Sequence, residues 1–351
     1  MSTDQDMEKM VAHLRSLSEH AGKIIDAQVG QTPKTLVWTK NKAKLYRYTH
    51  TSDTPIKFRT PFLMVYALVN KPFVLDLLPG RSFIEYLVKH GVDVYLLDWG
   101  SPGPEDRRLR FDDLVMDYLP RAVRQVLKTS QAEHLNILGY CLGGVLTTLY
   151  VTTHPDAPLN SVILLATPID FSHVDVFSTW LDPRYQDIDK LVDTMGNVPA
   201  QFVGVGTKLL KPYLSFVGTY QSLWENAEDE KFVETWGAMN RWIEESVPFA
   251  GEAFRQWIKD FYHSNKLIND QLMIGGLPAR LSNITFPILN IAAEADHLVP
   301  LSQTGPTLDK VSSTEKEFII MPGGHVGLVT SRKAVHNLWP KVVDWLAKHS
   351  D

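Results

Sequence analysis

Residues 136–144 read NILGYCLGG, an apolar run that leads into a turn rich in glycine. The pattern Gly139-x-Cys141-x-Gly143 is that of a nucleophile elbow, in which a serine normally occupies the central position. Such an elbow joins a buried strand to a helix and presents its nucleophile at the carboxyl edge of a parallel sheet. Because Cys141 is also the only cysteine of the 351 residues, the pattern predicts a catalytic thiol.

The segments around the elbow alternate between strand-like and helix-like patterns. Helical patterns at 81–91, 111–119, 143–154 and 333–348 separate short apolar runs at 62–69, 92–99, 135–141, 161–168, 286–294 and 316–322. Continuous apolar runs are typical of strands that are buried on both faces of a parallel sheet. The sequence therefore predicts an α/β-hydrolase fold with a mostly parallel central sheet.

This alternation stops between Pro168 and Phe286. Segment 170–282 contains five of the nine tryptophans and few strand-like runs, so we expect a helical cap inserted over the carboxyl edge of the sheet. The core then consists of residues 31–169 and 283–351.

Residues 1–30 form a separate N-terminal segment in this division. Within it, apolar residues recur at three- and four-residue spacing from Met7 to Ile25 and predict an amphipathic helix. Such a helix either packs on its own domain or binds a partner.

The composition is that of a globular protein, with 44% hydrophobic and 21% charged residues. The net charge of −5 and the lack of a basic block argue against a nucleic-acid partner. A single cysteine rules out an internal disulfide and fits a reducing cytosol. The acidic N-terminus is unlike a signal peptide, and no apolar run approaches the roughly 18 residues of a membrane span. We therefore expect a cytoplasmic protein.

The partners of an elbow nucleophile follow it in the order acid, then histidine. Asp296 follows the apolar run at 286–294, and His325 lies in a glycine-rich loop after the run at 316–322. Glu294 and His297 are alternatives for the acid and the base. A lone cysteine can also be a small buried hydrophobic residue, but the ordered set of three favours catalysis.

An oxyanion hole is expected from two backbone amides. One is that of Leu142, directly after the nucleophile, and the other belongs to Val69 or Asn70, in the loop after the first buried strand. We assign the second donor to Val69. The start of the following helix also places positive potential beside the sulfur, which favours the thiolate.

Sulfur suits an enzyme that passes an acyl group onward. Exchange between thioesters is nearly isoenergetic, so a cysteine keeps the acyl group activated until an alcohol accepts it. A hydrolase has no such need. The residue type therefore favours acyl transfer over hydrolysis.

Several stretches resemble the polyhydroxyalkanoate synthases: residues 65–100, which begin VYALVNKPFVLDLLPG, together with GYCLGG, ADHLVP and GGHVG. Parts of the cap are similar too, and the resemblance extends over about residues 35–346. The chain length is similar to that of the catalytic subunit in the two-component synthases of classes III and IV. Features of the cap favour class IV.

The resemblance implies polymerisation of (R)-3-hydroxyacyl-CoA, such as 3-hydroxybutyryl-CoA, with release of CoA. Cys141 matches the residue that carries the chain, His325 the base that activates it, and Asp296 the acid that assists attack by the substrate hydroxyl. It implies no cofactor and no metal, since CoA is part of the substrate.

The implied partners are a small second subunit of the PhaE or PhaR type, further copies of the chain and the surface of polyester granules. The N-terminal amphipathic helix is a candidate docking face for the second subunit. No motif marks a site for the CoA phosphates; the candidates are Lys71, Arg81, Lys208 and Lys211.

Two other functions remain open at this point. One is a cysteine-dependent thioesterase or polyester hydrolase of the same fold, and the other is a granule-surface protein without activity. The products formed from a hydroxyacyl-CoA separate all three: polymer, free hydroxyacid or none.

Overall fold

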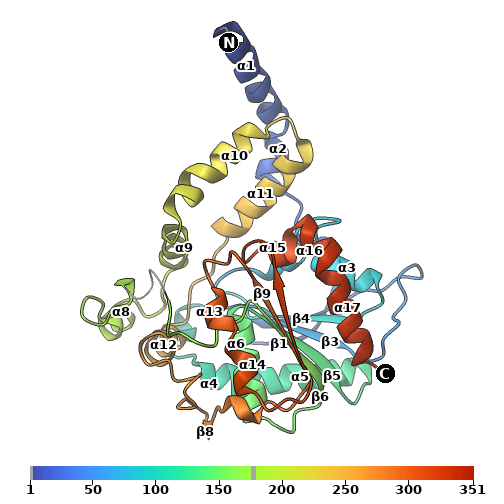
Figure 1. Cartoon of the computed structure of the whole chain (residues 1–351), viewed down its shortest axis with the longest axis vertical. Helices are drawn as coiled ribbons and strands as arrows, with labels where there is room; N and C mark the ends of the chain where they lie inside the picture. The colour runs from blue at the N-terminus through green and yellow to red at the C-terminus, as the bar shows by residue number, and fades with distance from the viewer. Residues whose placement is uncertain (1–2, 175–178) are drawn as a thin grey trace.

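The computed structural model describes residues 3–174 and 179–351, and its centre is an eight-stranded sheet (Figure 1). The strand order is β1-β2-β4-β3-β5-β6-β9-β10. Pairing is antiparallel from β1 to β4 and parallel from β4 to β10. The strands are β1 (Lys34–Lys40), β2 (Ala43–Tyr48), β3 (Phe62–Val65), β4 (Val94–Asp98), β5 (Leu135–Tyr140), β6 (Leu159–Leu165), β9 (Ile288–Ala293) and β10 (Lys316–Met321). The predicted fold is confirmed.

All six strands predicted from continuous apolar runs are present, and every residue of β3, β5 and β9 is buried. The prediction missed β1 and β2, which mix polar and apolar residues. These two strands extend the sheet at one edge, and every residue of β1 is exposed or only partly buried. An edge strand of this kind lacks the continuous apolar signature of a strand covered on both faces.

Helices cover both faces of the sheet. Crossovers between parallel strands are right-handed. Helix α3 leads from β3 back to β4, whereas α5 and α6 lead in the other direction, toward β6. Helix α3 therefore lies on the opposite face of the sheet from α5 and α6. Trp339 of α17 packs on Phe83 and Tyr86 of α3, so α17 shares its face. The core helices are α3 (Phe83–Lys89), α4 (Phe111–Asp113), α5 (Leu119–Ser130), α6 (Leu142–Thr153), α13 (Leu301–Thr304), α14 (Thr307–Lys310), α15 (Gly327–Thr330), α16 (Arg332–Asn337) and α17 (Trp339–Lys348).

Six shorter segments complete the helical structure of the described residues. Three are 3-10 turns: η1 (Pro72–Leu75), η2 (Pro104–Asp106) and η6 (Leu281–Asn283). Three others are π-helical: η3 (Leu114–Tyr118), η4 (Leu214–Gly218) and η5 (Trp257–His263). Of these, η3 lies within the helix predicted at 111–119, between α4 and α5.

Segment 170–282, the cap segment, is mainly helical where it is described. Its helices are α8 (Ile188–Met195), α9 (Ala200–Leu209), α10 (Thr219–Glu225), α11 (Glu230–Glu244) and α12 (Gly251–Gln256), and its strands are β7 (Met273–Ile274) and β8 (Leu277–Pro278). Residues such as Phe249, Trp257 and Phe261 belong to the same apolar cluster as the sheet. The later part of the segment is thus continuous with the core, and a separable cap stays a prediction.

The N-terminal segment forms two helices, α1 (Thr3–Glu19) and α2 (Ala21–Ile25), so the prediction of one continuous helix was wrong. Helix α2 packs closely on α11, where a side chain at Gly237 would come within 2.8 Å of the Ile24 Cα. Helix α1 instead projects from the body (Figure 1). None of the helices in the described part of the chain combines the length and hydropathy needed to cross a bilayer.

Candidate active site

Cys141 lies in the sharp turn between β5 and α6, with φ 55° and ψ −122°. This left-handed conformation is rare for residues other than glycine and is a source of local strain. The turn is held by close packing: a Cβ at Gly143 would lie 2.2 Å from the Val65 carbonyl oxygen, and one at Gly144 would lie 1.8 Å from the Thr167 Oγ1. Glycine at these two positions lets α6 approach the ends of β3 and β6. The elbow predicted from the sequence is therefore present.

Asp296 and His325 come together from the loops that follow β9 and β10. The His325 Nδ1 lies 2.7 Å from the Asp296 Oδ2. The other carboxylate oxygen, Oδ1, accepts hydrogen bonds from the amides of Leu298 and Val299, both at 2.9 Å. Because an ionised carboxylate only accepts, His325 donates from Nδ1 and its Nε2 remains for another partner.

The third member of the group is Cys141, whose side chain is hydrogen-bonded to that of His325. Burial by itself lowers the pKa of His325, but the charges of Asp296 and Cys141 outweigh burial and raise this pKa to about 10. The arrangement thus favours the protonated, imidazolium form of His325. Glu294 and His297, the alternative acid and base, are both exposed, whereas Asp296 and His325 are buried.

Aromatic side chains surround this group. The Tyr140 ring stacks on His325 with centroids 5.2 Å apart, and the Tyr66 ring lies 5.9 Å from that of Tyr140. Burial raises the pKa of Tyr66, Tyr140 and Tyr262, and the charge of Cys141 contributes in each case. All three phenols are therefore neutral at physiological pH and form a largely apolar wall near the sulfur.

These tyrosines are not among the residues predicted for the site. Tyr140 stands next to Cys141, so its position in the elbow was an available signal. Tyr66 directly follows β3, where the sheet's order reverses and ligands commonly bind. Tyr262 belongs to η5 of the cap segment, and nothing local in the sequence connects it with Cys141.

The two predicted oxyanion amides lie in suitable contexts. Leu142 is the first residue of α6, where a backbone N–H has no partner within the helix, and among the described residues it donates to no other group. The loop after β3 passes close to the elbow, as the contact between Gly143 and Val65 shows. In that loop the Val69 carbonyl oxygen accepts a hydrogen bond from the Val247 amide at 3.0 Å. The donor role of Leu142 and Val69 stays a prediction.

Comparison with protein families gives two matches. Residues 60–331 match the alpha/beta hydrolase fold. Residues 2–87 match the N-terminus of poly-beta-hydroxybutyrate polymerase, PhaC. The two matched ranges overlap and together include most of the chain.

Solved structures with a similar fold include a monoacylglycerol lipase from Paleococcus ferrophilus, at 17% identity and a TM-score of 0.56, covering 87% of this chain and 99% of that one. Another is a monoglyceride lipase from Saccharomyces cerevisiae, at 13% identity and a TM-score of 0.57, covering 93% and 98%. At these identities the likeness concerns the fold alone.

Curated relatives are much more similar in sequence. The poly(3-hydroxyalkanoate) polymerase subunit PhaC of Allochromatium vinosum is 36% identical over 98% of this chain and 97% of its own length. The proteins of the same name from Synechocystis and Haloferax mediterranei are 38% and 37% identical, over 92% and 98% of this chain and 86% and 69% of their own lengths. These relatives confirm the resemblance read from the motifs. The chain belongs to the PhaC family of poly(3-hydroxyalkanoate) polymerases, which are acyltransferases built on the α/β-hydrolase fold.

Proposed function

We propose that this polymerase uses (R)-3-hydroxyacyl-CoA substrates of short chain length, such as (R)-3-hydroxybutyryl-CoA, and carries the acyl group as a thioester on Cys141. The observation that carries the proposal is the site itself. A strained elbow thiol is hydrogen-bonded to His325, which is in turn hydrogen-bonded to a buried carboxylate. This is the arrangement of nucleophile, base and orienting acid that acyl transfer requires.

In the first step the Cys141 sulfur attacks the carbonyl carbon of the substrate thioester. The amides of Leu142 and Val69 stabilise the oxyanion, and the bond from carbon to the CoA sulfur then breaks. The proton held by His325 passes to the departing thiolate, so that CoA leaves as a thiol. The acyl group has moved from one sulfur to another and retains its activation.

In the second step the 3-hydroxyl group of another hydroxyacyl unit attacks the acyl carbon on Cys141. His325 accepts the hydroxyl proton, and Asp296 stabilises the imidazolium that forms. A C–O ester bond forms, the C–S bond breaks and the sulfur is released for the next cycle. The apolar wall of Tyr66, Tyr140 and Tyr262 supports this step because it disfavours water as a competing acceptor.

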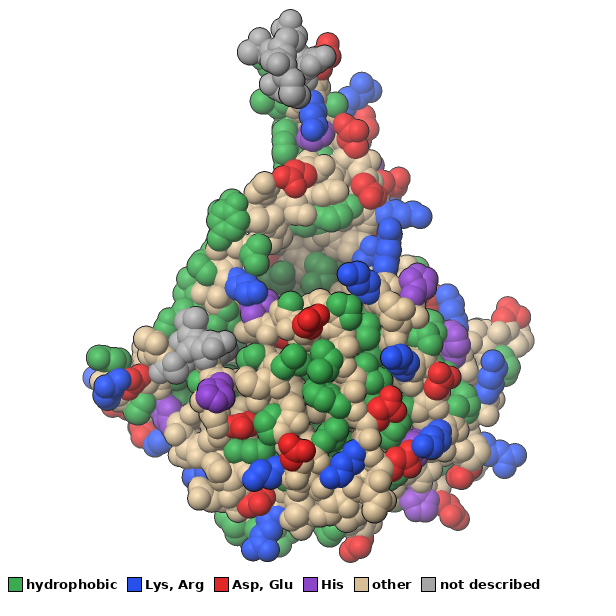
Figure 2. Space-filling model, in the orientation of Figure 1, with side chains coloured by type: hydrophobic (Ala, Val, Ile, Leu, Met, Phe, Trp, Pro, Cys, Tyr) green, Lys and Arg blue, Asp and Glu red, His purple; other side chains and the backbone are tan. Residues whose placement is uncertain are grey.

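CoA is anionic, and its entry would be favoured by basic groups at the mouth of the site. Figure 2 shows the surface hollowed between the part of the cap segment that carries α10 and α11 and the core beside α15, with Lys, Arg and His side chains around the opening. Lys71 and Lys208 are paired with Glu245 and Glu244. The pKa of Arg81 is lowered, mainly by burial and in addition by the nearby positive charge of Arg332. This pair is the better candidate for CoA phosphates.

The test is a product analysis with purified protein and (R)-3-hydroxybutyryl-CoA, with and without a candidate second subunit. Release of CoA together with insoluble polyester is the expected result. Release of CoA with free hydroxyacid would instead indicate a thioesterase. The Cys141→Ala variant should form no polymer, and polymer formation at the normal rate in this variant would refute covalent catalysis by the thiol.

We also propose that α1 is the docking face for a second subunit. The curated relatives are named as subunits, and Met7, Met10, Val11 and Leu14 form an apolar stripe on α1 with exposed fractions of 60%, 48%, 57% and 56%. The second half of the helix is anchored to the cap segment, where Ser16 Oγ donates to the Ala227 carbonyl oxygen at 2.8 Å.

Co-purification of the chain with a partner of the PhaE or PhaR type tests this docking face. The double variant Met10→Asp, Leu14→Asp should abolish co-purification, whereas Lys9→Asp, about 100° away from Met10 around the helix, should preserve it. Retention of the partner by the double variant would exclude the stripe. Oligomerisation and binding to the granule surface are proposed from the family and need the same kind of direct measurement.

A further inference from the structure

The loop that carries the proposed second oxyanion donor is held by the cap segment. We call residues 66–71, which follow β3, the oxyanion loop. The Val247 amide donates to the Val69 carbonyl oxygen at 3.0 Å. Next to this contact, Asn70 and Ser246 form an isolated antiparallel bridge, and the Asn70 Nδ2 donates to the Ser246 Oγ at 3.2 Å. Residues that lie 176 positions apart in the chain are thus paired like neighbouring strands.

Trp242, near the end of α11, connects the two ends of this loop. Its indole Nε1–H is shared between the Lys71 carbonyl oxygen at 2.9 Å and the Tyr66 hydroxyl at 3.2 Å. An ion pair between the Lys71 Nζ and the Glu245 Oε2, at 2.7 Å, adds a contact at the loop's end. Residues 242–247, which we call the clamp, therefore contact both ends of the oxyanion loop.

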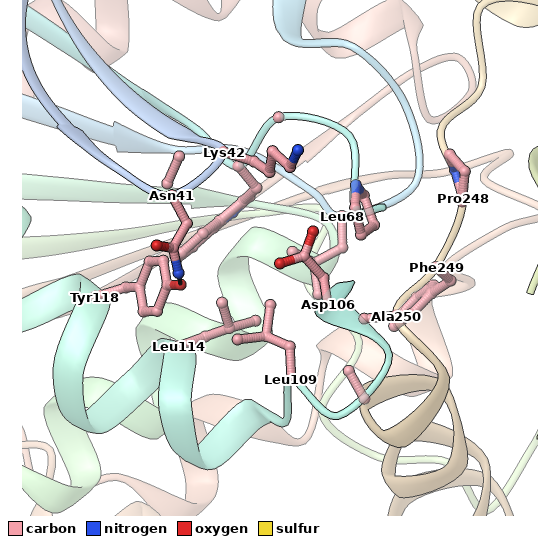
Figure 3. A pocket seen from close by; sticks show the side chains of 15 residues that line it. Asn41, Lys42, Leu68, Asp106, Leu109, Leu114, Tyr118, Pro248, Phe249 and Ala250 are labelled. Atoms are coloured by element: carbon pink, nitrogen blue, oxygen red, sulfur yellow. Dashed lines mark hydrogen bonds between the residues drawn. The ribbon is translucent and has the colours of Figure 1, made fainter. Parts of the chain in front are cut away.

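The core also holds the start of the loop, where the Trp99 Nε1 donates to the Tyr66 carbonyl oxygen at 2.8 Å, but the middle of the loop borders a cavity. A cavity with about 40 Å³ of water-accessible space is lined by Leu68 of the loop and by Pro248, Phe249 and Ala250, which directly follow the clamp. Figure 3 shows the Leu68 side chain at one wall of this cavity and Pro248, Phe249 and Ala250 at another. Side chains beside a void lack contacts on that side, so the loop has space into which it can relax if the clamp is weakened.

We propose that the clamp positions the oxyanion loop, and that Trp242 is a positioning residue for acyl transfer on Cys141. This inference rests on the proposed covalent function. Trp242 acts through the loop: its shared N–H sets the distance between Tyr66 and Lys71 and thereby the direction of the amide at Val69. A displacement of about 1 Å at a catalytic group can reduce a rate by up to about 100-fold, so a cap residue controls the chemical step.

The test compares two reactions of the same thiol. Acylation by (R)-3-hydroxybutyryl-CoA passes through an oxyanion, whereas alkylation by iodoacetamide is a direct displacement in which a C–S bond forms and iodide leaves. Alkylation therefore reports the reactivity of Cys141, the only cysteine, without any contribution from the oxyanion hole. Trp242→Phe keeps an aromatic ring and removes the N–H. It should lower the acylation rate about tenfold and change the alkylation rate less than twofold.

A matched control is available on the same helix. Trp236 donates its indole N–H to the Thr219 carbonyl oxygen at 3.0 Å, within the cap segment, and Trp236→Phe should leave both rates unchanged. If Trp242→Phe folds poorly, Ser246→Ala removes a single contact of the clamp and should lower acylation about threefold.

Equal losses in acylation and alkylation for Trp242→Phe would overturn the proposal, because the thiol itself would then be disturbed. Unchanged acylation would overturn it too. Failure of the covalent function has a different signature, since the wild-type protein would then not be acylated at all.

Discussion

Replacement of Asp296 by asparagine should separate the two half-reactions. The Asp296 Oδ1 accepts hydrogen bonds from the amides of Leu298 and Val299, and Oδ2 accepts one from the His325 Nδ1. In Asp296→Asn the new amide oxygen has to face the two backbone donors, because an NH₂ group there would meet N–H groups head-on. The NH₂ group then faces Nδ1 of His325. This nitrogen must become an acceptor, so the ring proton moves to Nε2 and the base can no longer accept a proton.

The size of the effect differs between the two steps. In serine triads the same change of tautomer lowers kcat about 10⁴-fold. An alcohol depends on the base in the same way, so we expect elongation to fall about 10⁴-fold. A thiol is much more acidic and forms a nucleophilic thiolate with less help, so acylation of Cys141 should fall only about 100-fold.

Rapid-quench measurement of CoA gives both rates: the first turnover reports acylation and the steady state reports elongation. Glu294→Gln is the matched control, because Glu294 is an exposed carboxylate two residues away, and both of its rates should be close to those of the wild type. Equal defects in the two steps of Asp296→Asn would refute the role of Asp296 in activating the hydroxyl. Wild-type rates would refute the tautomer argument altogether.

Three further predictions follow from the site. Cys141→Ser should accumulate an acyl-enzyme ester and elongate at least about 100-fold more slowly, because an oxyester is less activated than a thioester; mass spectrometry of the quenched protein detects the adduct. Gly143→Ala should lower the free energy of unfolding by about 2–3 kcal/mol, measured by urea unfolding, because the added Cβ would lie 2.2 Å from the Val65 carbonyl oxygen. The control is Gly206→Ala on α9, where a Cβ would meet no atom within 4 Å, and this variant should be neutral or slightly stabilising. The pKa of His325 is raised from 6.5 to about 10, so the stability that its protonated form contributes is complete below about pH 6.5 and is lost as the pH rises toward 10. The difference in Tm between the wild type and His325→Gln should therefore shrink over this range, and a difference that grows would contradict the assigned direction.

Local patterns in the sequence were sufficient to predict the central part of the fold. The six strands with apolar runs, the elbow at Cys141 and the loops that carry Asp296 and His325 could all be predicted, because each depends on neighbouring residues: a continuous apolar run, a glycine-flanked turn or a loop at a strand's end. The edge strand β1 and its neighbour β2 were missed because they have no such run. The break at His20, between α1 and α2, has no glycine or proline at that position to mark it.

The sequence by itself thus determined the order of Cys141, Asp296 and His325 along the chain and the type of chemistry proposed for them, since residue identity and local conformation decide both. Only the tertiary structure decided which distant side chains complete the site. Tyr66 and Tyr262 approach the thiol from separate segments, and Trp242 bonds to the carbonyl oxygen of Lys71 across 171 positions of sequence. Contacts of this kind form when whole helices and strands pack against one another. The residues next to each contact in the sequence do not indicate which distant residue it will meet.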